Sequence, residues 1–321
     1  MIEPEPYEVK VSRTVLRGRG RSNLPELPDE TATINLKLMI INYIHWNIDP
    51  EIINLFGISL RYYGILFVGG LILSIYILNW IFKKEGIPLD RLEKLSIYGM
   101  IGIVAGARLG HCLFYEPSYY LSHPLEIILP IQPNAVGGYK FSGFQGLASH
   151  GGALGVLIAL YLYSRKTKHS MIDTIDLIAI VGAVVGIFIR IGNFMNSEII
   201  GIPTTKPWGV IFERVDNVPR HPAQLYEAIS YFVIFMIMII LYRKMRERLR
   251  NGFFFGLVLV LVFSARFIIE FVKENQVGFE DKMTFNMGQL LSLPYIVVGI
   301  GFIIYGLIKT KKIINPAPNI I

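Results

Sequence analysis

One short stretch of the chain places a cation beside amide and carboxylate side chains at the end of an apolar segment. Residues 190–201 read Arg-Ile-Gly-Asn-Phe-Met-Asn-Ser-Glu-Ile-Ile-Gly and follow the apolar residues 174–189. On a helix, Arg190 and Asn193 share a face, and Gly192 leaves room for close backbone approach. A planar guanidinium beside small polar donors can bind a phosphate. The alternative is an arginine that reaches the lipid headgroups while the asparagines cap the helix.

Two more arginines interrupt apolar runs. Arg108 lies within residues 99–110, whose glycines form a helical stripe suited to tight helix–helix contact. We expect Arg108 either to line a cavity or to form an ion pair with Glu227 or Glu270. Arg266 and Glu270 are four residues apart. They can form an ion pair that offsets their own burial, or Glu270 can orient Arg266 as a second group that binds an anion.

Two histidines stand at the starts of other apolar runs. The N-terminal end of a helix disfavours a charged imidazolium, so His150, beside the open backbone of Gly151, can be a neutral base or acceptor. His150 can equally cap its helix. For His221, which precedes a proline, we favour a structural role at a helix start. Tyr226 and Glu227, one turn further on, can point at the site.

The composition indicates a polytopic membrane protein. Hydrophobic residues make up 53% of the chain, charged residues 17%, and the mean hydropathy is +0.49. The net charge of +7 requires no nucleic-acid partner, because cytoplasmic loops of membrane proteins collect Lys and Arg. A single cysteine, Cys112, excludes an internal disulfide and a multi-thiolate metal site. No HExxH-type metal spacing occurs among the six histidines.

Hydropathy predicts an all-α fold of about seven transmembrane helices with a small extracytoplasmic cap. Most runs approach the length of about 20 residues that spans a bilayer, and the third is short. Residues 42–60 are amphipathic, and we expect them at the membrane interface with His45, Trp46 and Asp49 near headgroups. The apolar runs are 61–82, 96–115, 150–164, 173–192, 223–242, 253–272 and 288–308.

The distribution of basic residues predicts the orientation. Loops after the odd-numbered runs hold fifteen Lys and Arg residues, and the intervening loops hold six. The loops after the odd-numbered runs are therefore predicted to be cytoplasmic, with the N-terminus outside and the C-terminus inside. Loops 116–149 and 193–222 then form the outer cap, and Tyr63 opens the first run at the outer boundary. On this topology the polar residues within the runs gather in the outer half of the membrane.

Three segments are expected in the chain. Residues 1–38 are polar and proline-rich, and we interpret them as a disordered or non-native N-terminal extension, with Met39 the more plausible start. Residues 39–312 are predicted to form a single transmembrane catalytic domain. Residues 313–321 are predicted to be a short cytoplasmic tail.

Seven short motifs, taken together, resemble the bacterial phosphatidylglycerol–prolipoprotein diacylglyceryl transferases. The similarity covers roughly residues 43–310, and Lys273 stands where the family usually has arginine. The motifs are Tyr-Gly at 63–64, Ala-Arg-Leu-Gly at 107–110, His-Gly-Gly at 150–152, the whole of 190–201, His-Pro-x-Gln-Leu-Tyr-Glu at 221–227, Arg-Phe-Ile-Ile-Glu-Phe at 266–271 and Met-Gly-Gln-x-Leu-Ser at 287–292.

The resemblance implies a cofactor-free transfer of the diacylglyceryl group of phosphatidylglycerol to the lipobox cysteine of a prolipoprotein signal peptide, in a bacterial cytoplasmic (inner) membrane. A thioether forms and glycerol phosphate leaves. The partners would be these two substrates and membrane lipids, without nucleic acid. The implied catalytic residues are His150, Arg190 and Arg266. The implied substrate-binding residues are Tyr63, Arg108, Gly151, Asn193, Asn196, Glu198, Gly201, Tyr226, Glu227 and Glu270.

Two other classes of membrane protein fit the sequence less well. A secondary transporter can use arginines for an anionic substrate, but no internal repeat is present and the polar residues are off-centre. An intramembrane serine protease needs a nucleophilic serine with a histidine partner. Ser149 precedes His150, but no Gly-x-Ser-x-Gly surrounds it.

Overall fold

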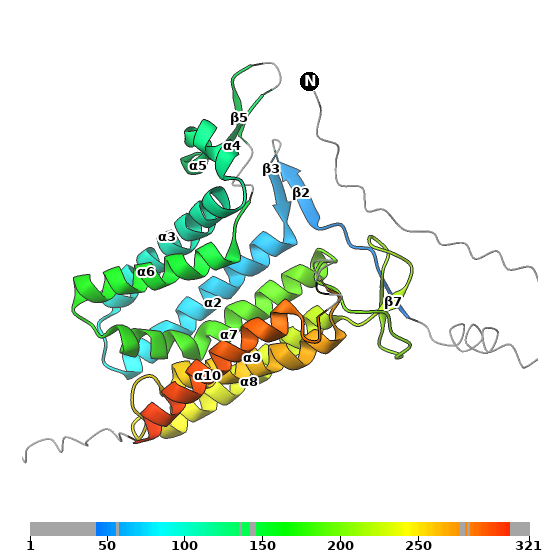
Figure 1. Cartoon of the computed structure of the whole chain (residues 1–321). Coiled ribbons are helices and arrows are strands. Elements are labelled where there is room, and N and C mark those ends of the chain that lie inside the picture. Colours follow the sequence, from blue (N-terminus) through cyan, green and yellow to red (C-terminus); the bar gives the residue numbers. More distant parts are fainter. Residues whose placement is uncertain are drawn as a thin grey trace, which may run out of the picture. The chain divides into compact units, whose positions relative to one another are not determined.

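The computed structural model describes residues 43–55, 58–134, 137–141, 146–275, 280 and 283–308. Within them, each predicted apolar run forms a long helix (Figure 1). The predicted extension 1–38 and tail 313–321 lie outside the described residues. The helices are α2 (Tyr62–Lys84), α3 (Leu89–Phe114), α6 (Ser149–Thr167), α7 (Met171–Met195), α8 (Ala223–Met245), α9 (Phe253–Ile269) and α10 (Met287–Ile308).

Six of these helices are long and apolar enough to cross a membrane, α9 counted with the 3-10 turn η1 (Glu270–Val272) that follows it. The prediction of a polytopic, mainly helical membrane protein is therefore confirmed. Among the long helices of the described residues, only α6 does not qualify. This helix comes from the run predicted to be short, and it carries Arg165 and Lys166 in its last turn.

Helix α6 packs along α3 through glycines on both helices. A Cβ atom on Gly106 would lie 2.4 Å from the carbonyl oxygen of Gly151, and one on Gly155 would lie 2.0 Å from that of Gly102. These distances leave no room for a side chain, so the two backbones touch directly. The predicted glycine stripe is confirmed from Gly102 onward, whereas Gly99 has nothing within 4 Å of its Cβ position.

The remaining long helices pack around α7 and along α9. Helix α7 contacts α2, α8 and α9, and α9 packs along α10. A continuous apolar core joins α2, α7 and α8, with Phe82, Ile180 and Met238 fully buried. Helix α7 is thus the central element, and its C-terminal end carries the Arg190 motif.

Short strands, which the sequence analysis did not predict, occupy one end of the bundle. β1 (Ile44–Trp46) pairs in parallel with β6 (Val210–Phe212), and β6 pairs with β7 (Pro219–Arg220). β2 (Glu51–Leu55) and β3 (Ile58–Arg61) form a hairpin before α2. Trp46, expected near headgroups, packs against the end of α7. Its ring lies 4.3 Å from that of Phe194, and its Nε1 donates to the Phe194 carbonyl at 3.1 Å.

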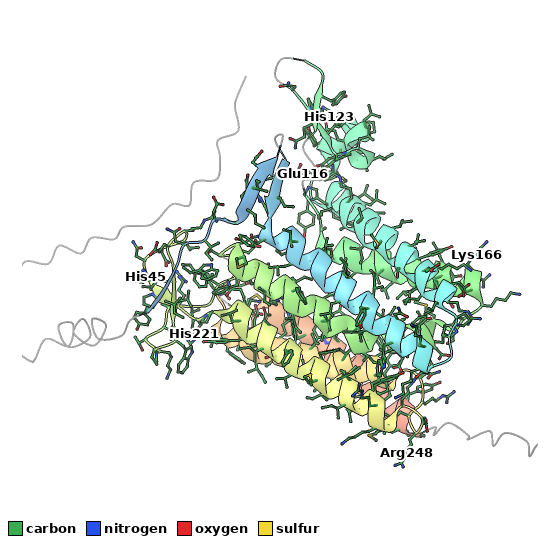
Figure 2. The ribbon with its side chains drawn as sticks, turned by 180° about the vertical axis from the view of Figure 1, so that it is seen from behind. His45, Glu116, His123, Lys166, His221 and Arg248 are labelled. Atoms are coloured by element: carbon green, nitrogen blue, oxygen red, sulfur yellow. The ribbon has the colours of Figure 1, made fainter. Side chains whose placement is uncertain are left out.

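The two loops predicted to form a cap pack in different places. Residues 116–149 form α4 (Pro117–Ser122), α5 (Pro124–Ile128), β4 (Ile131–Pro133) and β5 (Tyr139–Phe141), and α4 and α5 contact α3. Residues 193–222 provide β6 and β7. Figure 2 shows His45 and His221 at one end of the bundle and Lys166 and Arg248 at the opposite end. The basic ends of α6 and α8 and the polar end of α7 thus lie at opposite ends of the bundle.

The α3–α6 contact predicts opposite effects for two glycine substitutions on α3. Gly106→Ala should destabilise the protein by about 1–3 kcal/mol, because the new methyl group overlaps the Gly151 carbonyl. Gly99→Ala makes the same chemical change in open space and should be neutral or stabilising, since alanine favours a helix. Thermal unfolding of both purified variants in detergent checks this. Equal unfolding midpoints for the two would contradict the direct backbone contact.

Candidate functional site

The site is built on Arg190, in the last turns of α7. Its Nε lies 2.9 Å from Oε2 of Glu227 on α8, and its Nη1 donates to Oδ1 of Asn193 at 3.4 Å. The side chains of Arg190 and Glu227 are 12% and 0% exposed. The predicted shared face of Arg190 and Asn193 is confirmed. The partner of Arg190 is thus a fully buried carboxylate on a neighbouring helix.

Lys273 extends this contact into a chain of alternating charges. Its Nζ lies 3.9 Å from Oε1 of Glu227 and 2.9 Å from Oε2 of Glu270. Gly288 of α10 makes room for the Glu270 carboxylate, since a Cβ there would lie 2.5 Å from its Cδ. We call the four residues Arg190, Glu227, Lys273 and Glu270 the ion-pair chain. Alternation of sign offsets the cost of burying each charge.

The ion pair expected between Arg266 and Glu270 does not form. Helix α9 ends at Ile269, and Glu270 begins the 3-10 turn that directs its carboxylate to Lys273. Arg266 makes no hydrogen bond or ion pair with any described residue. It lies close enough to the Arg190 cluster to act electrostatically on Tyr231, which also interacts with Arg190. Arg266 is therefore a second cation near the site that is not neutralised by direct contact.

A hydrogen-bonded turn follows α7 and carries the rest of the motif. Glu198 Oε1 accepts from Asn193 at 3.2 Å and from Asn196 at 2.8 Å, and its carbonyl accepts from Gln224 at 2.7 Å. Ser197 and Ile199 both have positive φ angles, 55° and 58°. Such angles are strained for residues with a Cβ and are held only by surrounding contacts. The amides of the motif thus fix the turn that places Arg190.

Tyrosines and glycines complete the surroundings. The Tyr63 ring lies over Gly192, whose Cβ would be 2.8 Å from Tyr63 Cδ2. Gly201 is enclosed by His221 and Val272 at 2.5–2.6 Å from its Cβ position, so a side chain does not fit there. The Tyr226 hydroxyl accepts from Trp208 Nε1 at 2.8 Å and lies 3.0 Å from His221 Nδ1. His221, which lies just before the start of α8, therefore contacts Tyr226 in the first turn of that helix.

Arg220 ties the loops beside the ion-pair chain together. Its guanidinium donates to the Asp216 carboxylate at 2.6–3.2 Å and to the Gly201 carbonyl at 3.2 Å, and it pairs with Glu274 at 3.2 Å. We call these four residues the Arg220 clasp. The hydrogen bond from Arg220 holds the pKa of Asp216 below its usual value, against the opposing effect of burial.

Comparison with known proteins identifies the family. Residues 50–305 match the family model described as prolipoprotein diacylglyceryl transferase. The chain belongs to the prolipoprotein diacylglyceryl transferase family. It is 51% identical over 270 residues to the phosphatidylglycerol–prolipoprotein diacylglyceryl transferase of Bacteroides fragilis, which covers 84% of this chain and 98% of that protein. The proteins of the same name from Tolumonas auensis (46% over 258 residues; 80% and 95% covered) and Chloroherpeton thalassium (43% over 263; 81% and 92%) are similar.

Membership makes the chain a multi-pass membrane enzyme with prolipoprotein diacylglyceryl transferase activity. In the structure, most of the predicted site residues of this transferase lie close together. Arg190, Asn193, Asn196, Glu198 and Glu227 form one connected set, and Glu270 joins it through Lys273. Tyr63 and Gly201 pack against the same motif.

Three predicted residues lie on the α3–α6 pair instead. His150, in the first turn of α6, is exposed and makes no hydrogen bond or ion pair with a described residue. Gly151 is approached by the backbone of α3, so packing explains this glycine. Arg108 is buried and donates to the carbonyls of Ile127 and Gly146 at 3.3 and 3.4 Å.

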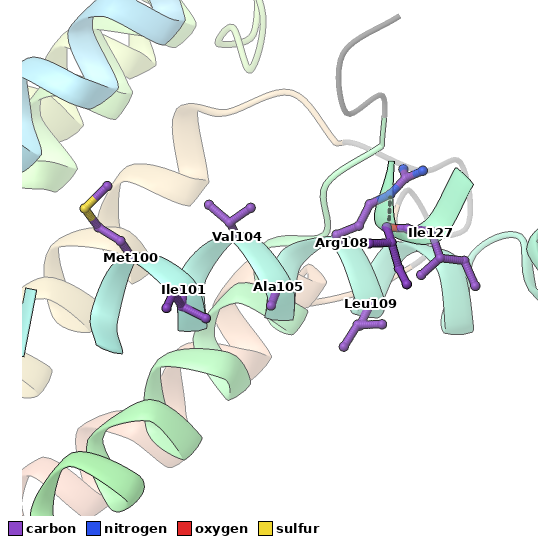
Figure 3. A pocket seen from close by; sticks show the side chains of 8 residues that line it. Met100, Ile101, Val104, Ala105, Arg108, Leu109 and Ile127 are labelled. Atoms are coloured by element: carbon purple, nitrogen blue, oxygen red, sulfur yellow. Dashed lines mark hydrogen bonds between the residues drawn. The ribbon is translucent and has the colours of Figure 1, made fainter. Parts of the chain in front are cut away.

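Arg108 also lines a cavity, as one of its two alternatives predicted. The cavity has a volume of ≈ 510 Å³. Figure 3 shows Arg108 at one end of it, hydrogen-bonded to Ile127, with the apolar side chains in a row along α3. The other lining residues are Met100, Ile101, Val104, Ala105, Leu109, Ile127 and Ile128. An apolar groove that ends at a cation has the chemistry to hold an acyl chain and its polar end.

The sequence predicted no role for Lys273, and Gln224 entered only as one position of the motif at 221–227. Lys273 follows an apolar run at a site expected to be a loop, and its burial depends on contacts with α8 and η1. Gln224 is fully buried and holds the Glu198 carbonyl. Its place at the start of α8, three residues before Glu227, is the one signal that pointed to it.

The Arg220 clasp predicts a pH-dependent stability. The folded pKa of Asp216 lies below its unfolded value, so its contribution is complete above about pH 4 and is lost as the pH falls below that. Asp216→Asn should lower stability at neutral pH by about 1 kcal/mol, and this deficit should shrink as the pH falls toward 2.5. Asp90→Asn, which breaks the exposed pair with Lys94, is the control and should change little at either pH. Thermal unfolding at both pH values measures this, and a deficit of equal size at pH 2.5 would exclude the charge as its cause.

Proposed function

We propose that this transferase moves the diacylglyceryl group of phosphatidylglycerol to the lipobox cysteine of prolipoprotein signal peptides, and that Arg190 holds the phosphate that leaves. The thiolate sulfur would form a bond to the glyceryl carbon while the bond from that carbon to the phosphate oxygen breaks. The lipid phosphodiester becomes glycerol phosphate and gains negative charge. Relatives whose names specify phosphatidylglycerol support this donor.

The buried contact of Arg190 with Glu227 is the observation that carries the proposal. Glu227 engages Nε and Asn193 engages Nη1, and a guanidinium has five N–H donors. The guanidinium is therefore held by an ion pair and a hydrogen bond while donors remain for phosphate oxygens. Donors that are already oriented stabilise developing charge without reorganisation. Arg266, a second nearby cation, would share this charge.

The remaining residues have supporting roles in this proposal. Asn193, Asn196 and Glu198 would position the turn and Arg190, and Tyr63, Arg108, Tyr226 and Glu270 would line the lipid and peptide sites. Gly151 and Gly201 would provide close packing that side chains would prevent. His150 would take the thiol proton. Its exposed ring at a helix start is free to meet a substrate, which is compatible with that role.

We also propose the predicted orientation, with this site toward the outer face of the bacterial cytoplasmic membrane. The described parts of the predicted outer loops support it, because β1 pairs with β6 and Gly201 bridges to Lys273. Loops assigned to one side of the membrane thus contact one another. The basic loop ends meet at the opposite end, where Arg91 lies 3.4 Å from His169 and Arg246 lies 3.1 Å from Glu85.

Labelling of single cysteines tests the orientation. In a Cys112→Ala background, a membrane-impermeant thiol reagent should modify Ser122→Cys in intact cells and leave Arg165→Cys unmodified. Both positions are exposed, and they lie in loops predicted to face opposite sides. After permeabilisation both should react, which controls for accessibility. Labelling of Arg165→Cys alone in intact cells would reverse the topology.

Substitutions of Arg190 and of His150 should impair the transfer reaction in different ways. Arg190→Lys keeps the charge but loses the planar fork, so the transfer rate should fall about 10²–10³-fold. His150→Gln should recover in part as the pH rises toward the ordinary thiol pKa of about 8.5, because the thiol then ionises without a base. The measurement is peptide lipidation rate against pH with phosphatidylglycerol saturating. A folded His150→Gln without recovery would leave His150 as a lipid-positioning group.

A further inference from the structure

A polar cavity lies at the end of the bundle opposite the ion-pair chain, where the C-terminal ends of α2 and α8 meet. Its volume is ≈ 380 Å³. Figure 2 marks this end of the bundle by Arg248. The lining residues are Lys84, Glu85, Tyr242, Arg243, Lys244, Arg246, Glu247 and Arg248. Five of the eight are cations, and the proposed transfer reaction uses none of them.

Arg246 forms the inner part of the cavity, and its charge is paired with carboxylates of neighbouring helices. It is buried, and it pairs with Glu85 at 3.1 Å and with Asp176 of α7 at 3.0 Å. The Tyr242 hydroxyl also donates to Glu85 at 3.0 Å. The two carboxylates nearest to Arg246 are therefore already engaged. They do not neutralise the cations at the mouth of the cavity.

The other four cations, Lys84, Arg243, Lys244 and Arg248, form no ion pair with any carboxylate in the described part of the chain. Two of them are held by aromatic rings. The Lys84 Nζ lies 5.0 Å from the Tyr242 ring centre, and the Arg243 guanidinium lies 5.2 Å from that of Trp80. Cation–π contacts orient a charge without cancelling it. The mouth is thus a positive site in which aromatic rings orient two of the four cations and no described carboxylate pairs with any of them.

The surroundings match the headgroup level of a membrane. Tryptophan and tyrosine side chains such as Trp80 and Tyr242 favour the boundary between headgroups and hydrocarbon. From the cavity toward the membrane centre, both helices expose apolar side chains, including Tyr76 on α2 and Ile240 on α8. A molecule with a phosphate in the cavity could lay acyl chains along these faces. Free phosphate would satisfy only the polar half of this arrangement.

We propose that this cavity binds the phosphate of an anionic lipid from the leaflet that faces this end of the bundle. Basic pockets at transmembrane helix ends bind lipid headgroups through clustered Lys and Arg side chains. Here the bound lipid would link α2 and α8 at their ends, beside the Arg246 pairs that join α7 and α8. The site is separate from the ion-pair chain and does not depend on the proposed chemistry there.

The test is a lipid titration of the full chain in phosphatidylcholine-containing micelles, followed by native mass spectrometry. The probe is phosphatidic acid, whose headgroup is a bare phosphate. Lys84→Gln/Arg243→Gln should weaken one phosphatidic acid binding event about 30-fold, because each basic residue near a headgroup contributes about fivefold. Lys244→Gln/Arg248→Gln should weaken the same event. Binding at the ion-pair chain is unchanged in all variants and does not affect the comparison.

Arg165→Gln/Lys166→Gln is the matched control. It removes two exposed cations from the end of α6, on the same side of the bundle but outside the cavity. Unaltered binding in this control, with transfer activity retained in all variants as the check on folding, supports the cavity. Equal weakening in control and cavity variants would mean general surface attraction and would overturn the proposal. Displacement of the lipid by millimolar inorganic phosphate would overturn the lipid as the occupant.

Discussion

The ion pair between Arg190 and Glu227 constrains the rest of the site. Both side chains are nearly or fully buried, at a depth where an unpaired charge costs several kcal/mol. Removing one partner of such a pair typically costs about 3–5 kcal/mol, because the other charge is left buried alone. Helices α7 and α8 must therefore keep a fixed register at this end. Lys273 and Glu270 continue the alternation, which brings η1 and α10 under the same constraint.

This constraint also prepares the site for an anion. Glu227 and Asn193 hold Arg190 before any substrate arrives, so binding a phosphate does not require the guanidinium to be ordered first. Two carboxylates within the ion-pair chain keep the buried charge near balance in the empty site. The phosphate that gains negative charge during the proposed reaction would also be attracted by Arg266, which no described carboxylate contacts. The strained residues Ser197 and Ile199 lie in the turn that maintains this geometry.

Much of this arrangement followed from local patterns in the sequence. Apolar runs predicted the long helices because hydrocarbon demands about 20 apolar residues per crossing. Spacing of three placed Arg190 and Asn193 on one face, and the glycines of α3 indicated a close neighbour. The partners of Glu270 and Trp46 could not be predicted in this way. Glu270 turns to Lys273 only because α9 stops at Ile269, and Trp46 meets Phe194 through a strand pairing across more than 140 residues. Such contacts depend on the assembled bundle, and no periodicity in the sequence encodes them.

The α7–α8 pair carries a second ion pair at its other end. There α7 supplies the acid and the residue after α8 supplies the base. Asp176 of α7 pairs with Arg246, which follows α8, whereas Arg190 of α7 pairs with Glu227 of α8. Each helix thus has its acid toward the N-terminal end and its base toward the C-terminal end. In an antiparallel pair, the N-terminal end of one helix meets the C-terminal end of the other, so each acid meets a base. A slip of one helical turn would break both pairs at once. The contact that ties α7 to α8 beside the basic cavity therefore also helps to fix the register that places Arg190 against Glu227.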